Sequence, residues 1–286
     1  MSIQLIDSSI EIILKNQHPS GSYADCPCFD TYKYCWLRDG SFICHAMDIY
    51  AHHDSAGRFL DWVDSVLSRQ VSRVKQLCEM AAAGQPLLNS EFLPARYNLD
   101  GTEVEDEWPN FQLDGYGTWL WALHEHIKVT GDTSLINKYS VSINLTVEYL
   151  TAFWRNPNYD CWEEHGDKVH PSTLACIYGG LKAINCYLND VHIDDTIDKI
   201  KTYIMHNCVK DDRLVKHTGS DSVDASLLWL ALPFGVFSAE DVIIQRTVKL
   251  IEEKLLSSGG IHRYPEDTYY GGGQWVLLSC WLGWYY

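Results

Sequence analysis

The amino-acid sequence predicts an all-α protein, and three observations support this. Apolar residues recur with helical spacing along most of the chain, as at Leu113, Tyr116, Leu120, Leu123 and Ile127. Alternating apolar and polar patterns of useful strand length are nearly absent. Hydrophobic residues make up 46% of the 286 positions and charged residues 21%, which is enough apolar content for a packed core.

The helical spacing predicts about ten helices in chain order. We expect them near residues 3–16, 41–53, 56–82, 113–130, 133–155, 171–188, 193–207, 224–236, 239–256 and 273–286. The helices at 41–53 and 224–236 are apolar on nearly every side, whereas most of the others are amphipathic. Helices of these two kinds indicate two concentric layers, with the more apolar helices inside.

Long irregular segments separate these helices, near residues 17–40, 84–112, 156–170, 208–223 and 257–272. In a compact domain, loops of this length usually carry function. No segment rich in proline, glycine or serine divides the chain, so we expect a single domain over residues 1–286.

Charge and composition exclude several classes of protein. The 22 basic and 38 acidic side chains give a formal charge of −16, which repels nucleic acids. No apolar window reaches ~20 residues and no export signal begins the chain, so we expect no membrane span and a cytoplasmic location. The ten cysteines are expected to be reduced. Neither the pair Cys26 and Cys28 nor the histidines at 52, 53, 124 and 126 show a metal-binding spacing, so we expect no metal or cofactor.

Acidic and aromatic residues cluster where four of the long loops meet an apolar helix. The clusters lie at residues 36–39, 108–115, 161–164 and 263–267, with a weaker one at 221–224. If alternate helices form an inner ring, their N-termini face the same end and these clusters converge on one mouth. Aromatic faces beside carboxylates and arginine are typical of a sugar site. Taken singly, Asp39, Asp114 and Asp224 are equally typical of helix N-caps.

Four segments resemble glycoside hydrolase family 15, which contains glucoamylases, glucodextranases and related α-glucosidases. They are Tyr32-Lys33-Tyr34-Cys35-Trp36-Leu37-Arg38-Asp39, Gln112-Leu113-Asp114-Gly115-Tyr116-Gly117, Trp162-Glu163-Glu164, and the run from Arg263 to Trp275. They occur in the family's order and span most of the chain. The resemblance implies an (α/α)6 helical barrel. It also implies inverting hydrolysis that releases glucose from the non-reducing end of short α-glucosides, without a cofactor.

The resemblance implies that Glu163 is the general acid and that Glu164 contributes where the leaving group binds. Inverting hydrolysis requires a protonated carboxyl to donate to the leaving oxygen. The apolar neighbour Trp162 and the like charge of Glu164 both favour a raised pKa at Glu163. The alternative is an exposed acidic pair at the start of a helix.

Arg38 and Asp39 resemble the pair that grips the hydroxyls of the terminal glucose, for which a guanidinium is well suited. They are also compatible with a buried ion pair beside a helix cap. By position in the family motifs, further contacts with the sugar are expected from Tyr32, Trp108, Trp162 and Arg263. Support for these side chains is expected from Asp114, Asp267 and Trp275.

One part of the family pattern has no match. The family's general base is a glutamate beyond the segment that resembles residues 263–275, after further helices. We therefore expect this base and the last barrel helices to lie beyond Tyr286, and residual or no hydrolysis by residues 1–286 alone. Glu266 and Asp39 are weaker candidates for the base.

Two other functions stay open at this point. Asp194, Asp195 and Asp198 match the pattern by which all-α terpenoid cyclases hold magnesium and a diphosphate, although acids in a first helical turn are also common without a metal. A sugar-binding relative without catalysis is the second alternative. The preferred linkage (α-1,4, α-1,6 or α,α-1,1) and the oligomeric state cannot be read from the sequence.

Overall fold

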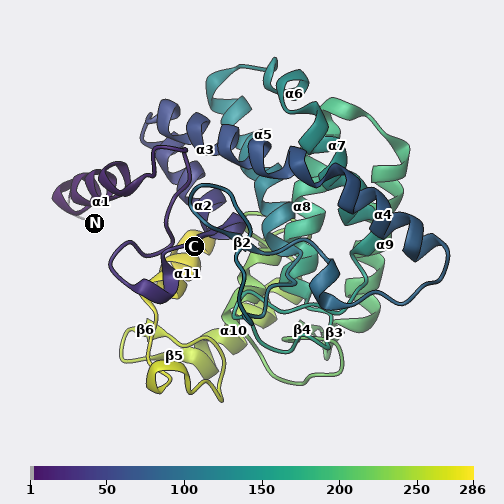
Figure 1. The fold of residues 1–286 in the computed structure, drawn as a ribbon. Coiled ribbons are helices and arrows are strands. Elements are labelled where there is room, and N and C mark those ends of the chain that lie inside the picture. Colours follow the sequence, from purple (N-terminus) through teal and green to yellow (C-terminus); the bar gives the residue numbers. More distant parts are fainter. Residues whose placement is uncertain (1–2) are drawn as a thin grey trace.

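The computed structural model describes residues 3–286, and helices dominate it (Figure 1). The α-helices are α1 (Ile3–Asn16), α2 (Leu37–Ile49), α3 (His53–Leu67), α4 (Val71–Ala82), α5 (Asp114–Thr130), α6 (Leu135–Lys138), α7 (Ser140–Phe153), α8 (Pro171–Leu188), α9 (Val191–Asn207), α10 (Val242–Leu255) and α11 (Val276–Tyr285). Short 3-10 helices connect them: η1 (Asp30–Tyr32), η2 (Ser68–Gln70), η3 (Asn89–Glu91), η4 (Ala225–Leu230) and η5 (Tyr269–Gly271). The all-α prediction is confirmed.

The strands of the described chain are short antiparallel pairs in loops. β1 (Cys35–Trp36) pairs with β2 (Arg96–Tyr97), β3 (Val209–Lys210) with β4 (Arg213–Leu214), and β5 (Leu256–Ser257) with β6 (Gly260–Ile261). The first pair ties the loop before α2 to the loop that leads into α5, because Trp36 lies opposite Arg96.

The helices form two layers, as predicted. α2, α5, α8, η4 and α11 pack side by side in that order as the inner row, and helices such as α3, α9 and α10 pack on its outside. Most residues of α5 and α8 are buried, as expected for helices with neighbours on several sides. α2 and α11, at the two ends of the row, line opposite parts of one cavity.

The closest approach in the inner row depends on two glycines. A Cβ atom at Gly180 would overlap the carbonyl oxygen of Gly117, and one at Gly117 would overlap the backbone of Cys176. Glycine at both positions therefore lets the backbones of α5 and α8 touch, which draws the N-terminal ends of the inner helices together.

The predicted helix at 224–236 is wrong. The structure has only the 3-10 helix η4 there, followed by turns. Pro233 lies inside the predicted span, and its ring nitrogen has no hydrogen to donate to the carbonyl four residues earlier. The segment is buried as predicted, so the apolar pattern identified burial rather than a full helix.

Three other boundaries differ from the prediction. The span 56–82 divides into α3 and α4 at η2, and the span 133–155 divides into α6 and α7. α2 begins at Leu37 rather than residue 41, which places Arg38 and Asp39 in its first turn. Boundaries shift in this way because helix ends depend on the packing of neighbouring segments.

None of the ten cysteines forms a disulfide, and none of the described helices is long and apolar enough to cross a membrane.

Candidate active site

A cavity of about 1730 Å³ lies at the N-terminal ends of the inner helices and extends between α2 and α11. The structure brings to its wall every site residue predicted from the sequence: Tyr32, Arg38, Asp39, Trp108, Trp162, Glu163, Glu164 and Arg263. Trp275, predicted as a support, lines the cavity as well. The loops that were expected to converge therefore do so, although they are more than 200 residues apart at the extremes.

Arg38 is held rigidly in the first turn of α2. Its Nη1 atom donates to Oε1 of Gln112 and to Oδ2 of Asp114, both at 2.9 Å. Gln112 is fully buried and Asp114 is 1% exposed, so both partners are shielded from water. A buried arginine anchored on one edge can present its remaining N–H groups to a ligand in a fixed geometry.

Asp39 is the cavity-facing partner of Arg38, whose Nη2 atom lies 3.2 Å from its Oδ2. This oxygen has no hydrogen-bond partner among the described residues and little contact with solvent. The low solvent exposure raises the pKa of Asp39, and the charge of Arg38 opposes that rise. The carboxylate of Asp39 lines the cavity, where a carboxylate is suited to accept hydrogen bonds from sugar hydroxyls.

Glu163 lies on a tight turn with a backbone φ of +66°, a conformation that residues other than glycine rarely adopt. The indole nitrogen of Trp36 donates to its Oε1 at 2.8 Å, and the amide of Gln112 lies 3.5 Å from the same oxygen. Burial raises the pKa of Glu163, while the neighbouring N–H donors and the charge of Arg38 act in the opposite direction. The raised pKa favours the protonated form of this carboxyl, which is the form that a general acid needs.

Asp160 shapes the turn that presents Glu163. Its Oδ1 accepts hydrogen bonds from the backbone N–H of Trp162 at 3.0 Å and of Glu164 at 2.9 Å, and its carbonyl accepts from Glu163. Burial raises the pKa of Asp160 to about 7, with Lys216 opposing. No motif identified this residue beforehand.

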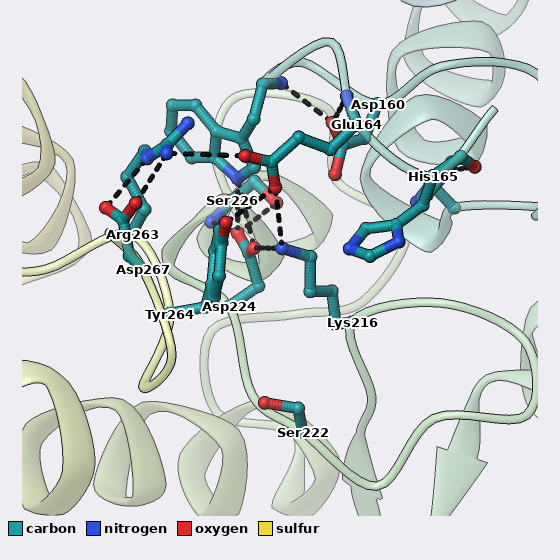
Figure 2. A network of polar contacts seen from close by, with 12 residues as sticks. Asp160, Glu164, His165, Lys216, Ser222, Asp224, Ser226, Arg263, Tyr264 and Asp267 are labelled. Carbon is teal, nitrogen blue, oxygen red and sulfur yellow. Dashed lines mark hydrogen bonds and ion pairs between the residues drawn. The ribbon is translucent and has the colours of Figure 1, made fainter. Parts of the chain in front are cut away.

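Glu164 points to a different group of side chains, which Figure 2 shows. Tyr264 donates its hydroxyl to Oε2 of Glu164 at 2.7 Å. The Nη2 atom of Arg263 lies 3.4 Å from Oε1, and the Nζ atom of Lys216 lies 3.6 Å from Oε2. Two cations therefore face one carboxylate at the rim of the cavity.

Buried carboxylates hold these cations in turn. Asp267 binds the guanidinium of Arg263 at 2.5 and 2.8 Å, which agrees with its predicted supporting position (Figure 2). Asp224 lies 3.3 Å from Nζ of Lys216 and accepts the indole N–H of Trp162 at 3.0 Å. Asp224 is also the N-cap of η4, which confirms the cap interpretation for this residue.

Aromatic rings form the wall around Glu163. The rings of Trp36 and Trp108 meet edge to face at 6.3 Å, and Tyr32 meets Trp108 at 6.4 Å. Behind them lies Arg96, fully buried, with its guanidinium 5.0 Å from Trp36 and 4.5 Å from Trp108. This cation keeps both indoles in place.

Some of these residues escaped the sequence analysis. Trp36 and Gln112 belong to the recognised motifs, but the sequence did not indicate that both contact Glu163. Asp25 lines the cavity without any motif. Partial burial and the neighbouring Asp39 raise the pKa of Asp25 to about 8.

The acidic residues of the cyclase alternative are not arranged for a metal. Asp195 lies on α9 and pairs with Lys199 at 2.5 Å, while Asp194 accepts a hydrogen bond from Asn185. Asp194 and Asp195 are thus each occupied by a different protein donor. None of them lines the large cavity.

Residues 14–284 match the family described as glycosyl hydrolases family 15. The chain is 38% identical to isomaltose glucohydrolase of Kribbella flavida over 288 residues, which cover 98% of this chain and 74% of that protein.

Solved structures show the same fold. A glycosidase variant in complex with glucose matches with a TM-score of 0.94 and 38% identity, over 99% of this chain and 77% of that one. A glucoamylase from Saccharomycopsis fibuligera matches with a TM-score of 0.74 and 16% identity, over 99% of this chain and 72% of that one. The (α/α)6 expectation is confirmed by these neighbours, of which the described residues form the larger part.

The two carboxylates and the arginines on one cavity suit glycoside hydrolysis, and neither the terpenoid cyclase nor the sugar-binding alternative is favoured by the comparisons. The chain belongs to glycosyl hydrolases family 15.

Proposed function

We propose that this glucose-releasing hydrolase acts on short α-1,6-linked glucosides of the isomaltose type, with Glu163 as the general acid. The contact between Trp36 and Glu163 is the observation that carries the catalytic assignment. This contact fixes one oxygen of the Glu163 carboxyl in the wall of the cavity. Burial raises the pKa of the same carboxyl. A carboxyl kept protonated there can donate to the oxygen of the bond that breaks.

Arg38 and Asp39 hold the terminal glucose in this proposal. Arg38 is anchored on Gln112 and Asp114, and the carboxylate of Asp39 accepts hydrogen bonds from sugar hydroxyls. On the other side of the acid, Glu164 and Arg263 face the position of the second sugar. The bond to be cleaved then lies between these two pairs of residues, next to Glu163.

The choice of substrate rests on the relative named isomaltose glucohydrolase. We retain the predictions of a cytoplasmic enzyme and of a small oligosaccharide as the binding partner. Water activation requires a second carboxylate ~6.5–9.5 Å from the acid.

Glucose release from isomaltose, maltose and trehalose tests the substrate. Fastest release from isomaltose, with β-glucose as the first anomer seen by proton NMR, supports the proposal. Faster release from maltose or trehalose overturns the linkage, and α-glucose as the first product overturns inversion.

A second assay separates the acid from the base. With azide as the nucleophile, α-glucosyl fluoride should be converted to β-glucosyl azide, because this reaction needs neither a general acid nor a general base. Binding of glucose, followed by tryptophan fluorescence, should persist in Glu163→Gln and be lost in Arg38→Ala. Equal binding by Arg38→Ala and the unmodified chain would show that the glucose site lies elsewhere.

A further inference from the structure

A second cluster of titratable side chains lies away from the sugar cavity. Asp48, His53 and His126 place their ligand atoms within 4.8 Å of one another. The Nδ1 atom of His53 lies 2.8 Å from Oδ1 of Asp48, and that of His126 lies 2.9 Å from both carboxylate oxygens. None of the three residues lines the cavity.

The cluster lies at the opposite end of the inner helices from the active site. Asp48 is the residue before the last in α2, and His126 stands in the last turn of α5, whereas Arg38 and Asp114 stand in their first turns. His53 is the first residue of α3. Three helices therefore contribute one side chain each.

The charge at this place calls for a cation. The Asp48 side chain is 1% exposed, and its ion-pair partners among the described residues are the two histidines, with no lysine or arginine. The C-terminal ends of α2 and α5 add partial negative charge to that of the carboxylate. A buried carboxylate in such a field needs a positive partner.

We propose that Asp48, His53 and His126 bind one divalent transition-metal ion such as Zn²⁺. Imidazole nitrogen and carboxylate oxygen are ordinary zinc ligands, with bond lengths of about 2.0–2.2 Å. Ligand atoms now in hydrogen-bond contact need to separate by only a few tenths of an ångström to surround an ion of that size. His53, whose side chain is 38% exposed, leaves a path from solvent and room for a water ligand.

Metal binding at this place replaces the hydrogen bonds between Asp48 and the two imidazoles. Each imidazole offers to the ion its Nδ1 atom, which now contacts Asp48. The ion then links α2, α3 and α5, and its stabilisation of the folded chain grows with the logarithm of its concentration over its Kd.

Titration of Zn²⁺ into metal-free protein by calorimetry tests the proposal. The Cys26→Ser, Cys28→Ser background removes the two neighbouring thiols near the cavity mouth, which are possible competing ligands. We expect one equivalent per chain, a rise in Tm, and at least a tenfold weaker Kd in His53→Ala. The matched control is His52→Ala, which removes the adjacent histidine outside the cluster and should leave the Kd unchanged.

His53→Cys provides an independent check, because a thiolate restores a zinc ligand and should recover binding. The melting temperatures of the metal-free variants show whether each one is folded. Absence of saturable binding, or the same Kd in His53→Ala and His52→Ala, would overturn the site and leave a hydrogen-bonded Asp–His pair. Neither result affects the proposed hydrolase, because the cluster does not touch the cavity.

Discussion

Glu163 and Glu164 are adjacent and chemically identical, yet the structure surrounds them differently. Glu163 receives neutral N–H donors from Trp36 and Gln112, and burial raises its pKa. Glu164 is 29% exposed on its side chain and faces Arg263 and Lys216. The first environment suits a carboxyl that holds and donates a proton, whereas the second places two cations against the carboxylate.

The comparison teaches that the local sequence cannot assign the two roles. Each glutamate owes its environment to residues far along the chain, with Trp36 lying 127 positions before Glu163 and Tyr264 lying 100 positions after Glu164. The left-handed backbone at Glu163 turns the two side chains toward different walls. Four substitutions test this division of roles.

Glu163→Gln should have the largest effect, because the amide cannot donate the proton to the leaving oxygen. Loss of a general acid typically lowers turnover by roughly 100- to 10,000-fold. In the unmodified enzyme, kcat/KM should fall as the pH rises through the raised pKa of Glu163, since activity requires the protonated form. Steady-state kinetics against pH measure both, and an unchanged upper limb in Glu163→Gln would contradict the assignment.

Arg38→Ala should rank second. It leaves Asp114 buried without its cation, and breaking such a pair costs about 3–5 kcal/mol of stability. Glucose binding should be lost as well. Arg38→Lys is the matched variant: it keeps the charge and much of the stability but loses the fixed guanidinium geometry. Urea unfolding measures the loss of stability, and fluorescence titration measures the loss of glucose binding. Full glucose affinity in Arg38→Lys would contradict the proposed role of the Arg38 guanidinium in holding the glucose.

Glu164→Gln should have a smaller and different effect. The amide no longer compensates the charges of Arg263 and Lys216, so the second sugar should bind more weakly. We expect KM for a disaccharide to rise about tenfold, which is the size of losing one hydrogen bond to a charged group, with kcat nearly unchanged. A loss of kcat equal to that in Glu163→Gln would show that the two roles are not separate.

Trp36→Phe should have the smallest effect on turnover and a specific effect on pH dependence. It removes the N–H donor that stabilises the ionised form of Glu163, so the pKa of Glu163 should rise further. The upper limb of the pH profile should move upward by about one pKa unit, as expected for a bond of this kind. A downward shift would mean that Trp36 supports the protonated form instead.

Much of the site was predictable because its residues occur in short motifs. Arg38 with Asp39, and Glu163 with Glu164, are neighbours in sequence, and all of the predicted site residues reach one cavity. The supporting contacts were not predictable in the same way. Arg96 behind the aromatic wall and Lys216 beside Glu164 belong to no motif, and the contacts of each are with residues distant in the sequence. The predicted catalytic and binding roles remain proposals.

Helical spacing and the absence of strand patterns were sufficient to determine an all-α, two-layered protein, because both signals come from residues within a few positions of each other. The family motifs could likewise be recognised within short segments of the sequence. Only the tertiary structure decided that η4 is a short 3-10 segment, that Trp36 binds Glu163, and that Asp48 meets His126 across 78 positions. Contacts over such separations depend on how the helices pack, and packing is a property of the whole chain.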